Sequence, residues 1–560
     1  MKNKTRKHQR RAPGERPAAR TGLSSRVSWL DYHAVALAAV VVLIGLVRLR
    51  LLSTPFERDE GEYAYVGSLI LHGGLPYRDA YNMKLPGTYG MYSLIVGAFG
   101  SSPAGVHAGF MIVSLATIVL AYAAFKRLFT PMIGLVAATT YGLLSISAPM
   151  LGTAAHATHF VNFFVVSGLW FYSRWNDRRP SLYGGLTGLA FGLAFLMKQP
   201  AVFLVAFGGL MVMVRAGAVM PRSWKTIATA AMAFGAAAAV PYLVVVLVVA
   251  AGGALEKFWF WTVTYAMGYA SADTPWELRR ALVGMSFGPM FREYPLVWLL
   301  APVGLAAVWI ARYDLRQKLL ATGLTVSSAA AVLPGLNFRN HYFVVLLPAL
   351  GLLVAIALEF VSRLFRSARR RPLVRALPFL AVAAMGVFAI ANGRAYYLDD
   401  PPDQVSRTMY SGNPFVEARE VGARIARDTT PADTVAVLGS EPEIFVYSGR
   451  RSATGYIYTY PLVEPQPANL RMQHEMMAEI EAARPKYLVY ADLQSSWAAT
   501  PDSPKDILGW FNRFAPANYD LVGLVEIGSG GTPTAYFWDD EARRTPMRPN
   551  SLWVLRRKGA

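Results

Sequence analysis

The stretch Glu57–Gly90 reads ERDEGEYAYVGSLILHGGLPYRDAYNMKLPGTYG and directly follows an apolar segment. It combines five carboxylates with three Lys/Arg residues, several tyrosines and two Pro/Gly turns. Carboxylates beside a bilayer carry a desolvation cost, so a cluster of them there indicates a site that needs a base or a cation. An ordinary polar loop between two helices is the alternative interpretation.

The composition of the whole chain excludes a soluble globular protein. Of its 560 residues, 54% are hydrophobic and only 16% are charged, which is typical of a polytopic α-helical membrane protein. The net charge is +20, but the basic residues fall between apolar segments and not in a groove with interleaved aromatics, so we expect no nucleic-acid partner. The chain has no cysteine, which excludes disulfides, thiol nucleophiles and cysteine-based metal sites.

About eleven apolar segments are long enough to cross a bilayer, since a span needs roughly 17 to 25 mainly apolar residues and fewer where a helix is broken. We expect these spans near 34–52, 103–125, 131–150, 157–173, 182–198, 200–215, 227–251, 295–311, 319–335, 342–361 and 376–392. The first is typical of an uncleaved signal anchor, because its apolar run is longer than that of a signal peptide.

The distribution of Lys and Arg predicts the orientation. The first 32 residues hold nine of them and indicate a disordered cytoplasmic tail. With the N-terminus inside, Lys and Arg concentrate in the connections that would face the cytoplasm, as the positive-inside rule requires. We therefore expect a multi-pass protein of the cell (inner or plasma) membrane, with the 57–90 stretch on the extracytoplasmic side.

Three regions follow from this interpretation: a basic tail over 1–32, a transmembrane domain over 33–392 with an external catalytic loop at 53–102, and a C-terminal domain over 393–560. In the last region the composition changes to short mixed segments. We expect strands at 434–439, 486–490, 519–526 and 551–555, and helices at 415–428 and 470–484. An odd number of spans places this small α/β domain on the extracytoplasmic side.

Asp59 and Glu60 are the candidate catalytic residues. They come about seven residues after the first span, at the depth of a lipid head group. A carboxylate there can act as a general base on an acceptor hydroxyl or can bind a divalent cation. A structural ion pair between Asp59 and Arg58 is the alternative.

Basic residues from three segments are candidates for binding a phosphate. Lys84 lies in a Lys-Leu-Pro-Gly turn that would hold its ammonium in place. Lys198 is the only charge between 180 and 214, although a residue at a helix end can also simply extend toward the head groups. Arg339 offers a planar fork for phosphate, and His341 can donate to a phosphate or relay a proton. One base with several cations on one membrane face is what displacement of a lipid-phosphate leaving group requires.

Further residues are candidates for contact with a substrate: Glu62, Tyr65, Tyr81, His156 and His159. The two histidines are three residues apart and would share one helical face, so they either bind a metal together or line a cavity as hydrogen-bonded polar groups. No cofactor is assigned, and a divalent metal stays open.

Several of these motifs resemble a known family. DEGEYAY at 59–65, GGLPYRD at 73–79 and KLPG at 84–87 are similar to the first external loop of the dolichyl-phosphate-mannose protein mannosyltransferase-like superfamily (glycosyltransferase family 39/83-like), which includes bacterial aminoarabinose transferase relatives. GLAFLMKQP at 192–200 and RNHYFVVLLPA at 339–349 fit the same pattern.

The resemblance implies a GT-C fold, a polyprenyl-phosphate-linked sugar donor and inversion at the anomeric carbon. By position, Asp59 matches the family's catalytic acidic residue, and Lys84 matches the basic residue of a Lys-x-Pro motif that faces the donor phosphate. Relatives often carry an acidic residue in the region that is His156 to Asn162 here, and this chain has none. A shared metal or second carboxylate is therefore open.

Together these observations predict a membrane glycosyltransferase of the cell envelope. It would bind a polyprenyl-phosphate-linked sugar between its helices, and its acceptor would be the hydroxyl of a glycan, a lipid or a protein. A lipid-linked sugar flippase or transporter is one alternative, but it would need charges near the middle of the membrane, and the spans hold almost none. A non-catalytic envelope scaffold, which predicts no turnover, is the other.

Overall fold

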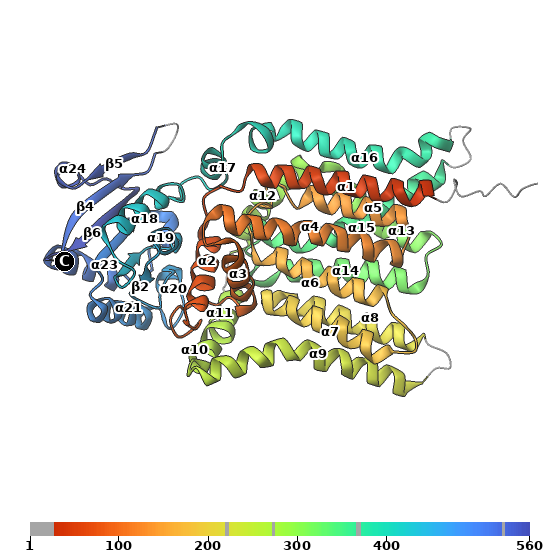
Figure 1. The fold of residues 1–560 in the computed structure, drawn as a ribbon, viewed down its shortest axis with the longest axis horizontal. Coiled ribbons are helices and arrows are strands. Elements are labelled where there is room, and N and C mark those ends of the chain that lie inside the picture. The colour runs from red at the N-terminus through yellow and green to blue at the C-terminus, as the bar shows by residue number, and fades with distance from the viewer. Residues whose placement is uncertain (1–26, 219–222, 272–274, 366–370, 529–531, 560) are drawn as a thin grey trace, which may run out of the picture.

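The computed structural model describes residues 27–218, 223–271, 275–365, 371–528 and 532–559. Long helices lie side by side in one bundle, and a smaller domain with a sheet covers one end of it (Figure 1). Helix α1 (Val27–Arg50) starts at the opposite end of the bundle. Most of the predicted tail, residues 1–26, lies outside the described residues.

A helix lies at every segment that was expected to cross the membrane. Besides α1 these are α4 (Pro103–Leu128), α5 (Pro131–Leu144), α6 (Ala157–Ser173), α7 (Pro180–Met197), α8 (Val202–Gly217), α9 (Trp224–Ala251), α13 (Pro295–Ile310), α14 (Leu315–Val332), α15 (Leu347–Leu364) and α16 (Arg371–Asn392). Within the described ranges, six helical stretches are long and apolar enough to span, or seven if α12 (Trp276–Glu293) and α13, bent by 95°, form one span. The multi-span architecture is confirmed, and the number of eleven stays a prediction.

Local sequence explains where these helices begin. Proline opens α4, α5, α7 and α13, where its fixed φ suits the first turn and its missing N–H is not needed. Ser102 and Thr130 cap α4 and α5 by accepting from the backbone N–H groups three residues on, each at 3.1 Å.

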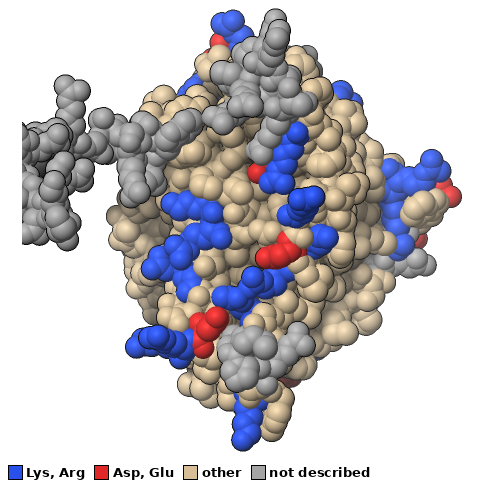
Figure 2. Space-filling view, turned by 90° about the vertical axis from the view of Figure 1, so that its right-hand side faces the viewer, with Lys and Arg blue, Asp and Glu red and all other residues tan. Residues whose placement is uncertain are grey.

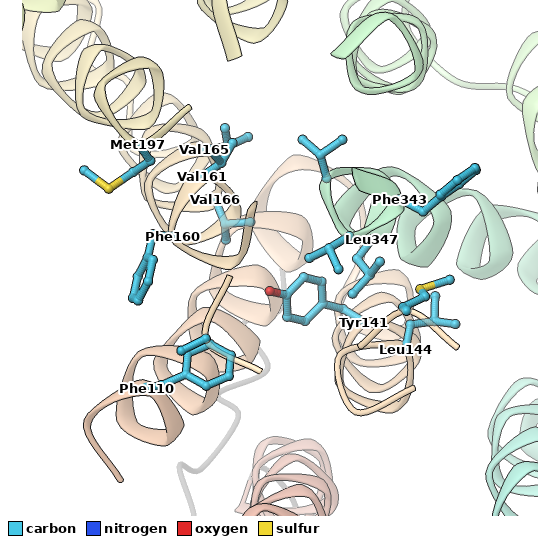
Figure 3. Packing of buried hydrophobic residues seen from close by; sticks show 14 of the residues in the cluster. Phe110, Tyr141, Leu144, Phe160, Val161, Val165, Val166, Met197, Phe343 and Leu347 are labelled. Carbon is cyan, nitrogen blue, oxygen red and sulfur yellow. The ribbon is translucent and has the colours of Figure 1, made fainter. Parts of the chain in front are cut away.

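The centre of the bundle is closely packed. Helix α15 lies inside it and is mostly buried. Helix α9 lies at the periphery, and few of its residues are buried. Aromatic and aliphatic side chains from α4, α5, α6 and α15 meet there, among them Phe110, Tyr141, Phe160 and Leu347 (Figure 3). Helices α7 and α9 approach through glycine, because a Cβ on Gly188 would lie 2.2 Å from the carbonyl oxygen of Phe234.

The predicted external loop is largely helical. It contains α2 (Arg58–Leu71) and α3 (Pro86–Phe99), joined by a short irregular segment. Glu57 and Glu60 form a capping box at the start of α2, and Pro86 opens α3. These two helices, with α10 (Leu255–Trp259) and α11 (Ala266–Ala270), lie between the bundle and the smaller domain (Figure 1).

The C-terminal α/β domain is confirmed. Its described residues form one mixed sheet in the order β2-β1-β3-β6-β4-β5, in which β1 runs parallel to β2 and β3 and the other pairs are antiparallel. The strands are β1 (Thr434–Leu438), β2 (Arg451–Ser452), β3 (Tyr487–Asp492), β4 (Tyr519–Glu526), β5 (Ala535–Trp538) and β6 (Ser551–Arg557). The main helices are α17 (Pro402–Met409), α18 (Glu417–Asp428), α19 (Glu443–Ser448), α21 (Asn469–Ala483) and α23 (Asp506–Asn518).

The end of the bundle away from this domain is strongly basic. Figure 2 shows Lys and Arg side chains spread over it, with few carboxylates among them. They come from the last turns of α4, α6 and α8 and the first turn of α14 and their connections: Lys126, Arg127, Arg174, Arg178, Arg179, Arg215, Arg312, Arg316 and Lys318. We call this surface the basic face.

Candidate active site

A cavity of about 280 Å³ lies where the bundle meets the C-terminal domain. Most of its lining comes from three parts of the chain: the start of α2 with the segment before α3, the connection between α14 and α15, and the C-terminal domain. Leu151, Tyr265 and Tyr269 complete it. The residues that matter below are Glu57, Arg58, Asp59, Lys84, Arg339, His341, Tyr342, Asn413, Tyr458, Tyr460 and Glu464. Asp59, Lys84, Arg339 and His341, which are distant in sequence, therefore meet at one cavity.

Asp59 lies in the first turn of α2 and is largely buried. Its Oδ1 is 3.2 Å from Lys84 Nζ and accepts a hydrogen bond from the Tyr458 hydroxyl, also at 3.2 Å. Burial alone would raise the pKa of Asp59, but the positive charge of Lys84, with His156 nearby, outweighs it and lowers the pKa to about 2. Asp59 is therefore ionised at neutral pH.

The second oxygen of Asp59 faces two histidines. His156 Nδ1 lies 3.9 Å and His341 Nε2 lies 4.0 Å from Oδ2, and the two imidazole rings stack with centroids 4.2 Å apart. The three side chains each offer one ligand atom within 4.8 Å of the others. Both ring nitrogens of His156 are buried without a hydrogen-bond partner among the described residues. One carboxylate and two imidazoles form a donor set that suits a divalent ion such as zinc.

His159 does not join this cluster, so the predicted pairing of His156 with His159 is not what the structure shows. The ring of His159 packs edge-on against Phe110, with centroids 4.9 Å apart. His156 precedes the helix with extended backbone (φ −63°, ψ 149°), and so the two residues do not share one helical face. His341, from another part of the chain, takes the place that His159 was expected to have.

Of the predicted phosphate-binding residues, Lys84, Arg339 and His341 line the cavity and Lys198 does not. Lys84 donates to the Tyr63 hydroxyl at 3.2 Å, and its own carbonyl accepts from Tyr77, so the turn that carries it is held in place. Arg339 lines the cavity and forms no ion pair with any residue in the described ranges. Lys198 lies deeper, with Nζ 3.9 Å from the ring centroid of Tyr342, whose ring also lines the cavity.

Glu60 is not at the cavity, although it was expected to act beside Asp59. Its carboxylate accepts from the Ala155 N–H at 2.6 Å and lies 2.9 Å from His107 Nε2. Successive helical residues point about 100° apart, so Asp59 faces the cavity while Glu60 faces the bundle. The contacts of Glu60 indicate a structural role.

The other candidates of the 57–90 stretch also lie outside the cavity. Glu62 is buried and accepts from the Tyr89 hydroxyl, and burial raises the pKa of Glu62 to about 8. Tyr65 accepts from the backbone N–H of Ser452 in the C-terminal domain at 2.9 Å. Tyr81 lines a separate small cavity. Tyr65 and Tyr81 contact the C-terminal domain, and Glu62 joins α2 to α3.

Arg58 does not pair with Asp59, and so the alternative of an ion pair between them is wrong. Its guanidinium reaches into the C-terminal domain, where it lies 3.3 Å from the Glu441 carboxylate and donates to Tyr460 and Asn413 at 2.7 and 3.1 Å. Arg58 thus joins the helix that carries Asp59 to the domain above it.

The walls contributed by the C-terminal domain were missed from the sequence. The segment GYIYTYP at 455–461 supplies Tyr458 and Tyr460, and Glu464 follows it. Tyrosine at every second position was the available signal, but it is equally typical of a half-buried strand. In the structure most of this segment is irregular backbone that lies over the cavity.

Comparison with known families supports this description in part of the chain. Residues 86–244, from α3 to α9, match the family model described as dolichyl-phosphate-mannose-protein mannosyltransferase. The matched segment begins just after Lys84, so Asp59 and Lys84 lie outside it. A search of curated proteins gave no match.

Solved structures match over almost the whole chain. The crystal structure of ArnT from Cupriavidus metallidurans bound to undecaprenyl phosphate is 15% identical, covers 93% of this chain and 97% of its own, and gives a TM-score of 0.56. The apo state of the same protein, also 15% identical, gives 0.53 over 94% of this chain and 98% of its own. The apo oligosaccharyltransferase of Archaeoglobus fulgidus, 14% identical, gives 0.51 over 94% of this chain and 76% of its own.

At this level of identity the solved structures establish the fold. The predicted resemblance to transferases of this fold is confirmed by the family match and by the structural likeness together. The chain is therefore a multi-pass membrane protein with the GT-C glycosyltransferase fold, and its residues 86–244 match the dolichyl-phosphate-mannose-protein mannosyltransferase family.

Proposed function

We propose that this protein is a glycosyltransferase that moves a sugar from a polyprenyl-phosphate donor to an acceptor hydroxyl. The observation that carries the proposal is the cavity between bundle and outer domain, in which an ionised Asp59 lies beside Lys84 and Arg339. A protein of the same fold has been solved bound to undecaprenyl phosphate, which supports a lipid phosphate as the donor's leaving group here.

The donor phosphate would bind to the cations. Arg339 has no carboxylate partner among the described residues and is available to an anion, while Lys84 would exchange part of its interaction with Asp59 for the phosphate. His341, in the cavity lining, would add a hydrogen-bond donor, and Lys198 would add positive charge from behind the Tyr342 ring. The polyprenyl tail would lie between helices at the bundle surface.

The transfer step is a displacement at the anomeric carbon. The acceptor oxygen forms a bond to this carbon as the bond to the phosphate oxygen breaks, which inverts the configuration. The acceptor proton passes to Asp59, and polyprenyl phosphate leaves with the electron pair. The cations stabilise the charge that develops on the leaving phosphate.

The pKa of Asp59 makes donor binding part of this mechanism. With Lys84 beside it, Asp59 is a weak base, because its pKa is about 2. A bound phosphate would compensate the charge of Lys84 and raise the pKa of Asp59, since the main influence that lowers it would weaken. Asp59 would thus become an effective base only when the donor is bound.

Asp59, His156 and His341 would hold a divalent cation if the enzyme uses one. Such an ion would act as a Lewis acid toward the phosphate oxygens. Asp59 Oδ1 accepts the hydrogen bond from Tyr458 and pairs with Lys84. Its Oδ2 faces the two histidines and would bind the cation.

We also propose that the N-terminus is cytoplasmic and that the cavity and the C-terminal domain lie outside the cell membrane. The basic face at the other end of the bundle supports this orientation, because basic connections are retained in the cytoplasm (Figure 2). The acceptor would be a glycan, a lipid or a protein, and the class that receives the sugar in a transfer assay identifies it.

Transfer by the reconstituted full-length protein tests the proposal. Radiolabelled polyprenyl-phosphate sugars are offered with envelope glycans, lipid hydroxyls and unfolded or secreted proteins as acceptors. We expect label on one acceptor class, inverted at the anomeric carbon, and one polyprenyl phosphate released for each transfer. Movement of labelled donor across the vesicle membrane without transfer would instead show a flippase, which the packed bundle interior disfavours.

A further inference from the structure

A second cavity, of about 320 Å³, opens at the basic face. It lies between the ends of α4, α6 and α8 and the start of α14, and its lining includes Arg127, Trp175, Arg215, Asp314 and Arg316. The 17 residues of α6 rise about 25 Å, since an α-helix rises about 1.5 Å per residue, and His156 and Trp175 flank its two ends. This cavity is therefore a full helix length away from Asp59.

Three arginines surround the cavity, and their charges are only partly compensated. Arg127 donates to the carbonyl of Ser173 at 3.4 Å and forms no ion pair with a described residue. Arg215 lies 3.3 Å from Asp177, and Arg316 lies 3.5 Å from Asp314. A cavity with three guanidinium groups and one lining carboxylate attracts an anion.

Asp314, the carboxylate in the lining, is already engaged in the fold. It caps α14 by accepting from the backbone N–H of Gln317 at 2.8 Å, and Gln317 returns the bond to its backbone. The Gln317 side chain in turn donates to the carbonyl of Leu128 at 2.9 Å, which ties α14 to α4. The cap explains the aspartate, and the contacts of the three arginines described above leave most of their N–H groups available to a ligand.

Trp175 provides an independent indication of a ligand. It is only 9% exposed, it lines the cavity, and its indole N–H is buried without a hydrogen-bond partner among the described residues. A buried donor without an acceptor is unfavourable, so native proteins leave few of them. An anionic oxygen that reaches this N–H beside the arginines would supply the missing acceptor.

From this arrangement we propose that the cavity binds a phosphate-bearing anion at the membrane face opposite the active site. Basic pockets between the ends of transmembrane helices bind the head groups of anionic lipids, and this cavity lies where helices of the bundle end on the basic face. The same donors would also bind free phosphate, so the shared chemistry is a phosphate group, and the experiment separates its two sources.

Native mass spectrometry of the full-length protein in detergent tests the site, with phosphatidylglycerol and phosphatidylcholine titrated separately. The site variant is Arg127→Gln/Arg316→Gln. The control is Arg178→Gln/Arg179→Gln, which removes the same charge from exposed positions of the basic face outside the cavity lining. A competition arm adds inorganic phosphate at millimolar concentration.

The affinity of the tightest phosphatidylglycerol site should fall at least about 10-fold in the site variant, because charge-assisted hydrogen bonds are lost. In the control it should fall less than about 2-fold. Trp175→Phe, which keeps the ring and removes the N–H, should weaken it by about 5-fold. If the lipid does not bind and inorganic phosphate, titrated alone, binds with an affinity that depends on the same arginines, free phosphate is the ligand. Equal effects of the two double variants on both lipid and phosphate would overturn the proposal.

Discussion

The two ends of the bundle carry many charged residues, but they hold them differently. At the outer end Asp59 and Arg58 are buried and Lys84 is partly buried, and all three contact partners from other segments of the chain. At the basic face most charges lie on exposed connections, and the carboxylates of their ion pairs, Asp177 and Asp314, are themselves exposed. Burying a charge costs free energy, which well-placed partners must offset. The outer end is therefore organised for chemistry, whereas the basic face mainly contacts the membrane surface.

The largest effect should follow from changing the buried carboxylate at the cavity. Asp59→Asn keeps the side-chain shape but cannot accept the proton, so transfer should fall by at least about 100-fold, the usual contribution of a general base. Glu60→Gln is the neighbouring control and should keep turnover within about 5-fold, with a lower melting temperature because its charge-assisted contact with His107 weakens. Near-normal transfer by a folded Asp59→Asn protein would reject the role of Asp59.

The next largest effect should appear in donor binding. Lys84→Ala or Arg339→Ala should each weaken the binding of a polyprenyl-phosphate sugar by about 10-fold or more, because each removes a charged hydrogen-bond donor. Arg178→Gln, on the basic face, should leave that affinity unchanged. Equilibrium binding of a labelled donor measures all three, and an unchanged affinity in both cavity variants would refute the phosphate clamp.

A smaller effect should separate two tyrosines of the outer domain. Tyr458→Phe removes the hydrogen bond to Asp59, and kcat should fall by about 5-fold with little change in KM, given the net value of one hydrogen bond to a charged group. Tyr460→Phe removes a bond to Arg58 instead and should lower the melting temperature more than kcat. The reverse pattern, with kcat sensitive only to Tyr460, would show that Asp59 is not positioned by Tyr458.

The smallest effect concerns pH and Glu62. Its pKa in the folded protein is about 8, against an ordinary value of 4.5, so the folded state keeps a proton that the unfolded state loses between these values. Stability should therefore fall as pH rises from about 4.5 to 8. Glu62→Gln removes this titration and should flatten the dependence of the melting temperature on pH. A Glu62→Gln protein with the same slope as the wild type would contradict this assignment.

Much of the bundle could be predicted because its helices have strong local signals. The apolar runs at 103–125, 157–173 and 182–198 agree closely with α4, α6 and α7. The helices α2 and α3 were taken as a loop, because their charged and glycine-rich sequences lack the apolar length of a span and are stabilised by packing between two domains.

The site was predictable where a residue's chemistry was unusual for its position, as for Asp59 and Lys84. The site could not be predicted where tertiary contacts determine which of two neighbouring residues faces the cavity. Glu60 looks as catalytic as Asp59 in the sequence, and only the helical phase and the position of His107 distinguish them. Tyr458 could not be assigned to the cavity, because it lies 399 residues from Asp59 in the sequence.

Arg58 has a consequence for attempts to exchange parts between relatives. It is adjacent to Asp59 in the chain, yet its partners Glu441, Tyr460 and Asn413 all belong to the C-terminal domain. A chimaera that combines this bundle with the C-terminal domain of another enzyme would keep Arg58 but lose its partner Glu441. Asp59, the next residue, would then be held less firmly at the cavity. A C-terminal domain introduced to change the acceptor must therefore also supply a carboxylate and hydrogen-bond acceptors that contact Arg58.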